Sequence, residues 1–141
     1  MSTGIARARE ELFAAHLLAT TGFAAQCVAL SFRAALAAAE AALLLLDRAP
    51  DPRPAAVVSA FVTQVVRERG LDPHTGQRLR SLLNRAEQAN ADGAVPQPES
   101  AAAIADATEV VDVVATWIEK SHQVASERAR PKPGPRPEQP R

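Results

Sequence analysis

The feature that most constrains this chain is an alanine-rich apolar stretch in its N-terminal third. Residues 23–47 read FAAQCVALSFRAALAAAEAALLLLD, and alanine makes up 31 of the 141 residues of the chain. Alanine has the highest helix propensity of all residues, and its small side chain lets neighbouring helices approach closely. The chain holds only four Phe, one Trp and no Tyr, which disfavours an all-β fold. We therefore expect an all-α protein in which this stretch forms the central helix.

Apolar residues recur at three- and four-residue spacing in five segments, which predicts five helices. These helices are expected to span about residues 5–20, 23–47, 55–69, 73–90 and 99–124. Gly22 supplies a left-handed stop, and Gly70 follows the end of the third helix. Three prolines interrupt Arg48–Pro54, and Asp72-Pro73 has the pattern of an N-cap followed by a proline in the first turn. The expected fold is a five-helix, up-and-down antiparallel bundle.

The inward-facing positions follow from the same spacing. The predicted core stripes are Ile5, Ala8, Leu12, Ala15 and Ala19; Cys27, Leu30, Ala34, Ala37, Ala41 and Leu44; Val57, Val58, Phe61 and Val65; Leu79, Leu82, Leu83 and Ala86; and Ile104, Ala107, Val111, Val114 and Ile118.

The composition changes near residue 126 and predicts two parts. Residues 1–125 are expected to form the helical domain, and residues 126–141 a disordered tail rich in Pro and Arg. The segment RARPKPGPRPEQPR, residues 128–141, contains five prolines, five basic residues and one acidic residue. Such a segment cannot bury enough apolar surface to fold by itself.

The sequence predicts a cytoplasmic protein that binds no membrane, metal or cofactor. The first ten residues are charged, and Glu40 interrupts the most apolar run, residues 34–46. The single cysteine, Cys27, cannot form an internal disulfide and is expected to be a small core residue. Neither Cys27 nor the three histidines, His16, His74 and His122, lie at a metal-ligand spacing. The excess of alanine and arginine is typical of a GC-rich bacterial genome.

The charge pattern offers two interpretations of the fourth helix. Residues 67–85 carry five arginines and two acids, whereas residues 99–119 carry five acids and no base. Arg78, Arg80 and Arg85 therefore form either a solvated face paired with the acidic helix or a basic ridge that binds a phosphate backbone. Trp117 is expected in the core or at an interface, and with no aromatic near the arginines, stacking on single-stranded bases has little support.

The order of the segments resembles a HEPN domain over residues 6–120. The segments that carry the resemblance are ARAREELFAAHLLATTGF, CVALSFRAALAAAEAALLLL, VVSAFVTQVVRERGLDP, LRSLLNRAEQANADG and AAAIADATEVVDVVATWI. They are most similar to the small stand-alone HEPN proteins of actinobacterial type. The resemblance implies an all-α antiparallel bundle that dimerises, and a frequent partner in a nucleotidyltransferase-like protein or another nucleic-acid enzyme.

Active HEPN proteins resemble metal-independent ribonuclease toxins. Their arginine holds the scissile phosphate, and a histidine separated from it by about four to six residues moves the proton of the ribose 2′-OH or of the leaving oxygen. Arg85 matches the arginine by position, but residues 90–92 are Asn90, Ala91 and Asp92. Asparagine cannot carry a proton near neutral pH. The resemblance therefore implies a scaffold without its general base.

A second arginine–histidine pair, Arg69 and His74, has the family spacing but straddles Gly70 and Pro73. We expect His74 to be an exposed turn residue. His16 is expected to be partly buried, and His122 is expected near the end of the last helix, where a cation suits the helix dipole.

Three functions follow from these observations. The leading hypothesis is a catalytically degenerate HEPN protein, a dimeric module that binds RNA, a nucleotide or a protein through Arg78, Arg80 and Arg85. The second is a ribonuclease toxin of a toxin–antitoxin system, which would use Arg69 and His74 or an unusual Asn90. The third is a helical bundle that only binds other proteins.

Overall fold

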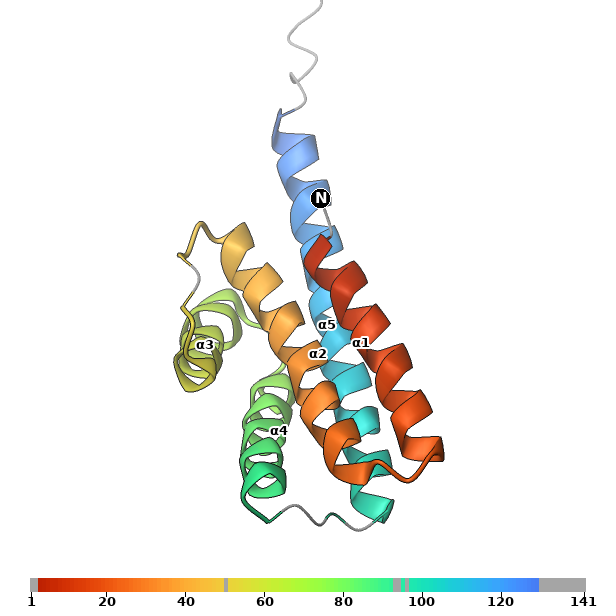
Figure 1. Ribbon diagram of the computed structural model, residues 1–141. Helices are drawn as coiled ribbons and strands as arrows, with labels where there is room; N and C mark the ends of the chain where they lie inside the picture. The colour runs from red at the N-terminus through yellow and green to blue at the C-terminus, as the bar shows by residue number, and fades with distance from the viewer. Residues whose placement is uncertain (1–2, 50, 93–94, 96, 130–141) are drawn as a thin grey trace, which may run out of the picture.

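The computed structural model is all-helical over the residues that it describes, which are 3–49, 51–92, 95 and 97–129 (Figure 1). The helices are α1 (Thr3–Thr20), α2 (Ala24–Leu45), α3 (Pro54–Phe61), its π-helical continuation η1 (Val62–Arg67), α4 (Pro73–Asp92) and α5 (Gln97–Ala129). The prediction of an all-α protein with five helices is confirmed.

Four of the helices run lengthwise and alternate in direction, whereas α3 lies across them and is seen nearly end-on in Figure 1. Within the described residues, α3 packs only on α2, α4 and its own continuation η1. The central position belongs to α2, which contacts α1, α3, α4 and α5. The array is therefore a lengthwise set of four helices with a short transverse helix on one side.

The alanines of α2 make this crowded arrangement possible. Ala34, Ala35, Ala38, Ala39 and Ala42 are fully buried, so their methyl groups form the surface on which the other helices pack. By length and composition α2 is also the one helix in the described chain that could cross a membrane, but half of its most apolar window is buried inside the protein. That burial is the environment of a core helix.

Most of the predicted core stripes are buried, and the largest fully buried side chains include Phe61, Leu79 and Leu82. One predicted core residue is placed wrongly, because Leu44 is 58% exposed. Leu44 lies in the last turn of α2, where its side chain lines a surface hollow instead of the core.

Left-handed glycines end two of the helical segments, and this conformation was predicted for Gly22. Gly22 has φ +85°, and the Phe23 N–H donates to the carbonyl of Leu18 at 3.0 Å, which closes the end of α1. Gly70 has φ +76° and ends the helical segment that holds Arg69. Asp72 caps α4, since its Oδ1 accepts the N–H of His74 at 3.0 Å. A side chain at φ > 0 is strained, so glycine is the residue these two turns require.

The sequence predicts a regular α-helix over residues 55–69, but its second half, η1, is π-helical. The widened segment packs on α4 at Gly76, where an added Cβ would lie 3.2 Å from Val62 Cγ2 and 3.5 Å from Val66 Cγ2. Gly76 therefore allows η1 to approach α4 closely.

The last helix is longer than predicted. Residues 126–129 continue α5, so the tail cannot begin at residue 126. The composition change misplaced the boundary because none of residues 126–129 is a helix breaker, and the first proline is Pro131. The rest of the predicted tail, from residue 130, lies outside the described residues.

Candidate functional site

The arginine face of α4, defined as Arg78 and Arg85, lies opposite the acids of α5, whereas the third candidate arginine, Arg80, is exposed on another side of the helix. Arg78 Nε is 2.6 Å from Glu109 Oε2, and Arg85 Nη1 donates to Asp106 Oδ2 at 3.0 Å. The two helices are antiparallel, so the later arginine meets the earlier acid. Two of the three guanidinium groups are thus already neutralised by helix-to-helix ion pairs.

The surroundings of Arg85 do not resemble a proton-transfer site. Its guanidinium binds a carboxylate, and the side chains of Arg85 and Asp106 are only 26% and 28% exposed. Asn90 is exposed on the last turns of α4, and His74 lies about three turns before Arg85 on the same helix. Within the described chain, no histidine forms a hydrogen bond or ion pair with Arg85. The arrangement stabilises the α4–α5 interface rather than presenting an acid or base.

Arg69 and His74 are separated by the Gly70 turn. Both side chains are exposed, and His74 lies in the first turn of α4, where its own N–H binds the Asp72 cap. The prediction of His74 as an exposed residue is confirmed. Arg69, by contrast, lines a hollow against α5 to which His74 does not contribute.

We call this cavity the Trp117 hollow. It measures about 720 Å³ and is lined by Arg69, Trp117, Lys120, Ser121, Val124, Ala125 and Arg128. All of these residues except Arg69 belong to one face of α5, because they recur at three- and four-residue spacing. Trp117 is partly buried and packs against the core, and it also lines the hollow.

The three cations of this hollow have no ion-pair partner among the described residues, which is also true of Arg48, Arg67 and Arg80, but only these three line one cavity together. Within the described residues, six arginines form ion pairs: Arg7, Arg9, Arg33, Arg53, Arg78 and Arg85. Arg69, Lys120 and Arg128 form none with any described residue, and all three line the same hollow. Their charges therefore remain available to an anionic ligand.

A second, smaller hollow shares Trp117 and Lys120 with the first. Its volume is about 350 Å³, and the other lining residues are Leu71, Asp112, Val113 and Thr116. Asp112 already binds Arg9 Nη1 at 2.9 Å, so its charge is compensated. The two hollows form one surface in which a basic lobe and a more apolar lobe meet at an indole ring. An anionic group and a flat apolar group of one ligand could both be accommodated there.

Sequence reasoning missed this surface and placed binding on the arginine face instead. A signal was present, because Trp117, Lys120, Val124 and Arg128 recur at helical spacing and follow directly on the acidic part of the last helix. The contribution of Arg69 could not be found in this way, since it depends on the turn at Gly70.

The single cysteine and two of the histidines lie outside these surfaces. Cys27 is fully buried as predicted, and its thiol donates to the carbonyl of Ser100 at 3.9 Å. Burial raises the pKa of this thiol. His16 is exposed rather than partly buried, because it faces away from α2 and α5. His122 lies two turns before the end of α5, so the predicted interaction with the helix end is wrong. The described residues contain no cluster that could hold a metal ion.

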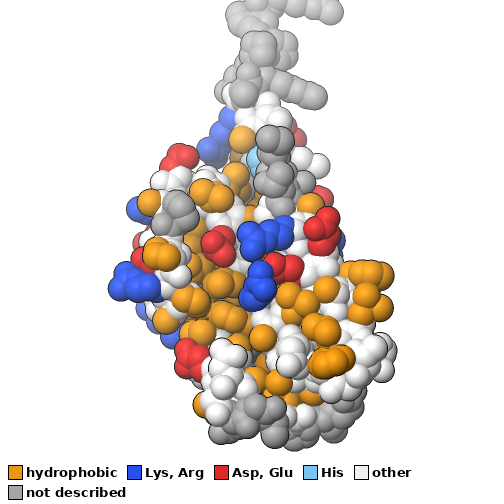
Figure 2. All heavy atoms as spheres, viewed as in Figure 1, with side chains coloured by type: hydrophobic (Ala, Val, Ile, Leu, Met, Phe, Trp, Pro, Cys, Tyr) orange, Lys and Arg blue, Asp and Glu red, His pale blue; other side chains and the backbone are white. Residues whose placement is uncertain are grey.

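Hydrophobic side chains also reach the surface on α1 and at the start of α2. Phe13, Leu17 and Phe23 are 68%, 55% and 51% exposed. Figure 2 shows hydrophobic side chains gathered toward the lower right of the view, on the side where α1 runs. Exposed large apolar side chains that lie close together are typical of protein interfaces.

Comparisons with protein-family models, with curated proteins and with solved structures find no match to this chain.

Proposed function

We propose that this chain is a non-catalytic, HEPN-like helical module that binds single-stranded RNA at the Trp117 hollow. The observation that carries the proposal is the convergence of one indole ring and three cations without partners, Arg69, Lys120 and Arg128, on one cavity. Nucleic acid in single-stranded form is bound by cations that track its phosphates and by aromatic rings on which its bases stack. The choice of RNA over DNA comes from the resemblance to HEPN proteins.

Binding without cleavage is supported by the lining of the hollow. No histidine is among its described lining residues, and Asp112 in the adjoining lobe is already bound by Arg9. Arginine and lysine hold their protons at neutral pH, so they stabilise phosphate charge but do not remove a proton from a ribose hydroxyl. Dimerisation and a cytoplasmic location remain predictions from the sequence.

The chain offers its own probe for this proposal, because Trp117 is its only tryptophan. We expect oligoadenylate to quench the fluorescence of Trp117 at low salt. Log affinity should fall linearly with log salt, with a slope near −2, since each phosphate contact with a single strand contributes about −0.7. A Trp117→Leu variant, followed by anisotropy of labelled RNA, should bind about tenfold more weakly.

The RNA should be recovered intact after incubation with the wild-type protein. Unchanged fluorescence together with no binding at low salt would exclude this function. The remaining candidate would then be a helical bundle that binds another protein, which the exposed side chains of Phe13, Leu17 and Phe23 favour. Cleavage of the RNA would instead support the ribonuclease hypothesis.

A further inference from the structure

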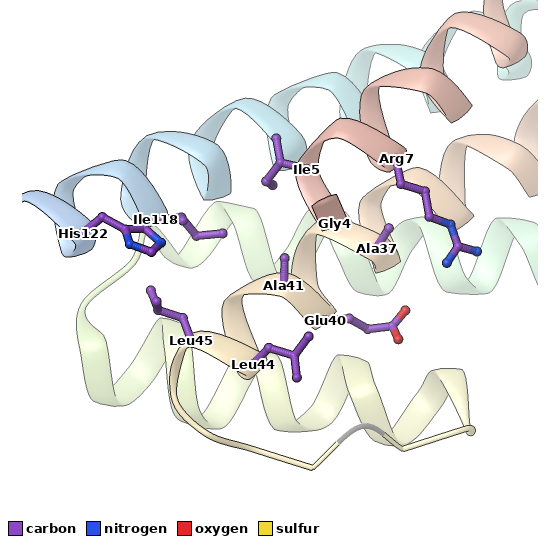
Figure 3. Close-up of a pocket in the computed structure, with 10 residues that line it drawn as sticks. All are labelled: Gly4, Ile5, Arg7, Ala37, Glu40, Ala41, Leu44, Leu45, Ile118 and His122. Carbon is purple, nitrogen blue, oxygen red and sulfur yellow. The ribbon is translucent and has the colours of Figure 1, made fainter. Parts of the chain in front are cut away.

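A separate hollow lies between α1, the last turns of α2 and α5, and we call it the Arg7–Glu40 hollow (Figure 3). Its volume is about 470 Å³, within the range of about 300–1,000 Å³ that small-molecule cavities have. The lining residues are Gly4, Ile5, Arg7, Ala37, Glu40, Ala41, Leu44, Leu45, Ile118 and His122. None of them lines the Trp117 hollow, so the two surfaces are independent.

Small residues create the space. An added Cβ on Gly4 would lie 2.8 Å from Ala41 Cβ, so α1 and α2 touch almost backbone to backbone at this point. Ala37 and Ala41 contribute only methyl groups beside this contact. Ile5 of α1 and Ile118 of α5 also line the hollow (Figure 3). The result is an apolar floor with room above it.

The two charges at one end of the hollow face one another without forming an ion pair. Figure 3 shows Arg7 from α1 and Glu40 from α2 with their charged groups directed toward the same space. The Nε of Arg7 binds Glu11 Oε1 at 3.4 Å, so its two terminal nitrogens have no partner among the described residues. Glu40 is partly buried and has no hydrogen bond or ion pair with a described residue. Desolvation raises the pKa of its carboxyl group, Arg7 partly opposes that effect, and the nearby carboxylate of Glu11 adds to it.

These charges select among ligands. A lone ammonium group placed at Glu40 would be repelled by Arg7, and a lone carboxylate placed at Arg7 would be repelled by Glu40. A head group that carries both charges on one carbon satisfies both residues, because guanidinium donates to carboxylate and carboxylate accepts from ammonium. Leu44, Leu45 and Ile118 are then in position to cover an apolar side chain.

We propose that the Arg7–Glu40 hollow binds an α-amino acid with an apolar side chain. Arg7 holds its carboxylate, Glu40 holds its ammonium group, and the floor takes the side chain, with the imidazole of His122 at the opposite end. This inference does not depend on the RNA-binding proposal.

Calorimetric titration with leucine and two analogues tests the proposal on the full chain. Isoamylamine is leucine without its carboxylate, and isocaproate is leucine without its amine. We expect leucine to bind and each analogue to bind at least about tenfold more weakly, because each lacks one charge-assisted hydrogen-bonded group. Equal affinity for leucine and either analogue, or no heat with leucine at millimolar concentration, would overturn the proposal.

Two variants assign the head group. Glu40→Gln should weaken leucine about tenfold but not isocaproate, and Arg7→Gln should weaken leucine but not isoamylamine. Glu10→Gln is the matched control, since Glu10 is an exposed carboxylate on α1 outside the hollow, and it should leave leucine affinity unchanged. Loss of leucine binding in Glu10→Gln as well, or in neither Glu40→Gln nor Arg7→Gln, would contradict the assignment. Circular dichroism establishes that each variant is folded.

Discussion

The arginine face and the Trp117 hollow have similar numbers of basic residues but opposite surroundings. On the arginine face, Arg78 and Arg85 bind Glu109 and Asp106 across the α4–α5 interface. In the Trp117 hollow, no described carboxylate binds the three cations. Arg78 and Arg85 must give up ion pairs that join two helices before they can bind a ligand, whereas the cations of the Trp117 hollow exchange only water. Available charge, and not the density of charge along the sequence, therefore marks the candidate surface.

The largest expected effect comes from removing the unpartnered cations. In the triple variant Arg69→Ala/Lys120→Ala/Arg128→Ala, affinity for oligoadenylate at low salt should fall about a hundredfold, and the salt slope should approach zero. Anisotropy of labelled RNA over a salt series measures both quantities.

The control for this experiment is the double variant Arg78→Ala/Arg85→Ala. Its RNA affinity should change by less than about threefold, because those arginines are bound to carboxylates. An equal loss of affinity in the double and the triple variant would mean that the arginine face is the binding surface after all.

A smaller effect is expected at the turn that positions Arg69. Gly70→Ala and Gly22→Ala each place a side chain at φ > 0 with open space around it, so each should lower the free energy of unfolding by about 1 kcal/mol. Urea denaturation measures this cost. Only Gly70→Ala should also weaken RNA binding, since Gly22 lies in the α1–α2 turn and lines neither hollow. Equal RNA affinity in the two variants would show that the turn does not position Arg69.

The smallest effect concerns stability at the α4–α5 interface. A double-mutant cycle between Arg85→Ala and Asp106→Ala should give a coupling free energy of about 0.5–1 kcal/mol, the upper part of the range for partly exposed ion pairs. Arg69→Ala should change the free energy of unfolding by less than about 0.5 kcal/mol, because Arg69 is exposed and forms no hydrogen bond or ion pair with a described residue. A larger cost for Arg69→Ala would reveal a structural role and weaken the contrast between the two regions.

The fold could be predicted where local chemistry decides it. Gly22 and the Asp72-Pro73 pair mark helix ends through backbone conformation and capping, which depend on neighbouring residues alone. The π-helical turns of η1 could not be predicted, because they accompany the close approach of Val62 and Val66 to Gly76 in another helix. The transverse position of α3 likewise depends on packing between distant segments.

Only part of the candidate site could be predicted from the sequence. The opposite charges of the fourth and fifth helices predicted that Arg78 and Arg85 could be paired, and the structure contains these pairs. The Trp117 hollow joins the last residue of one helical segment, Arg69, to a helix far along the chain, and no spacing rule relates Arg69 to Trp117. Its cations were therefore counted in the sequence but not assigned to one place.

One consequence follows from the length of α5. Its last turns extend past the other helices in Figure 1, and the side chains of residues 122–128 are all exposed. The outer wall of the Trp117 hollow is thus a helical end that few neighbours hold in place, and such ends open locally at low free-energy cost. A ligand that binds both Arg69 and Arg128 requires the last turns of α5 to remain helical. Its affinity is then thermodynamically linked to helix fraying, so a change in the helicity of the last turns could tune binding without altering any contact.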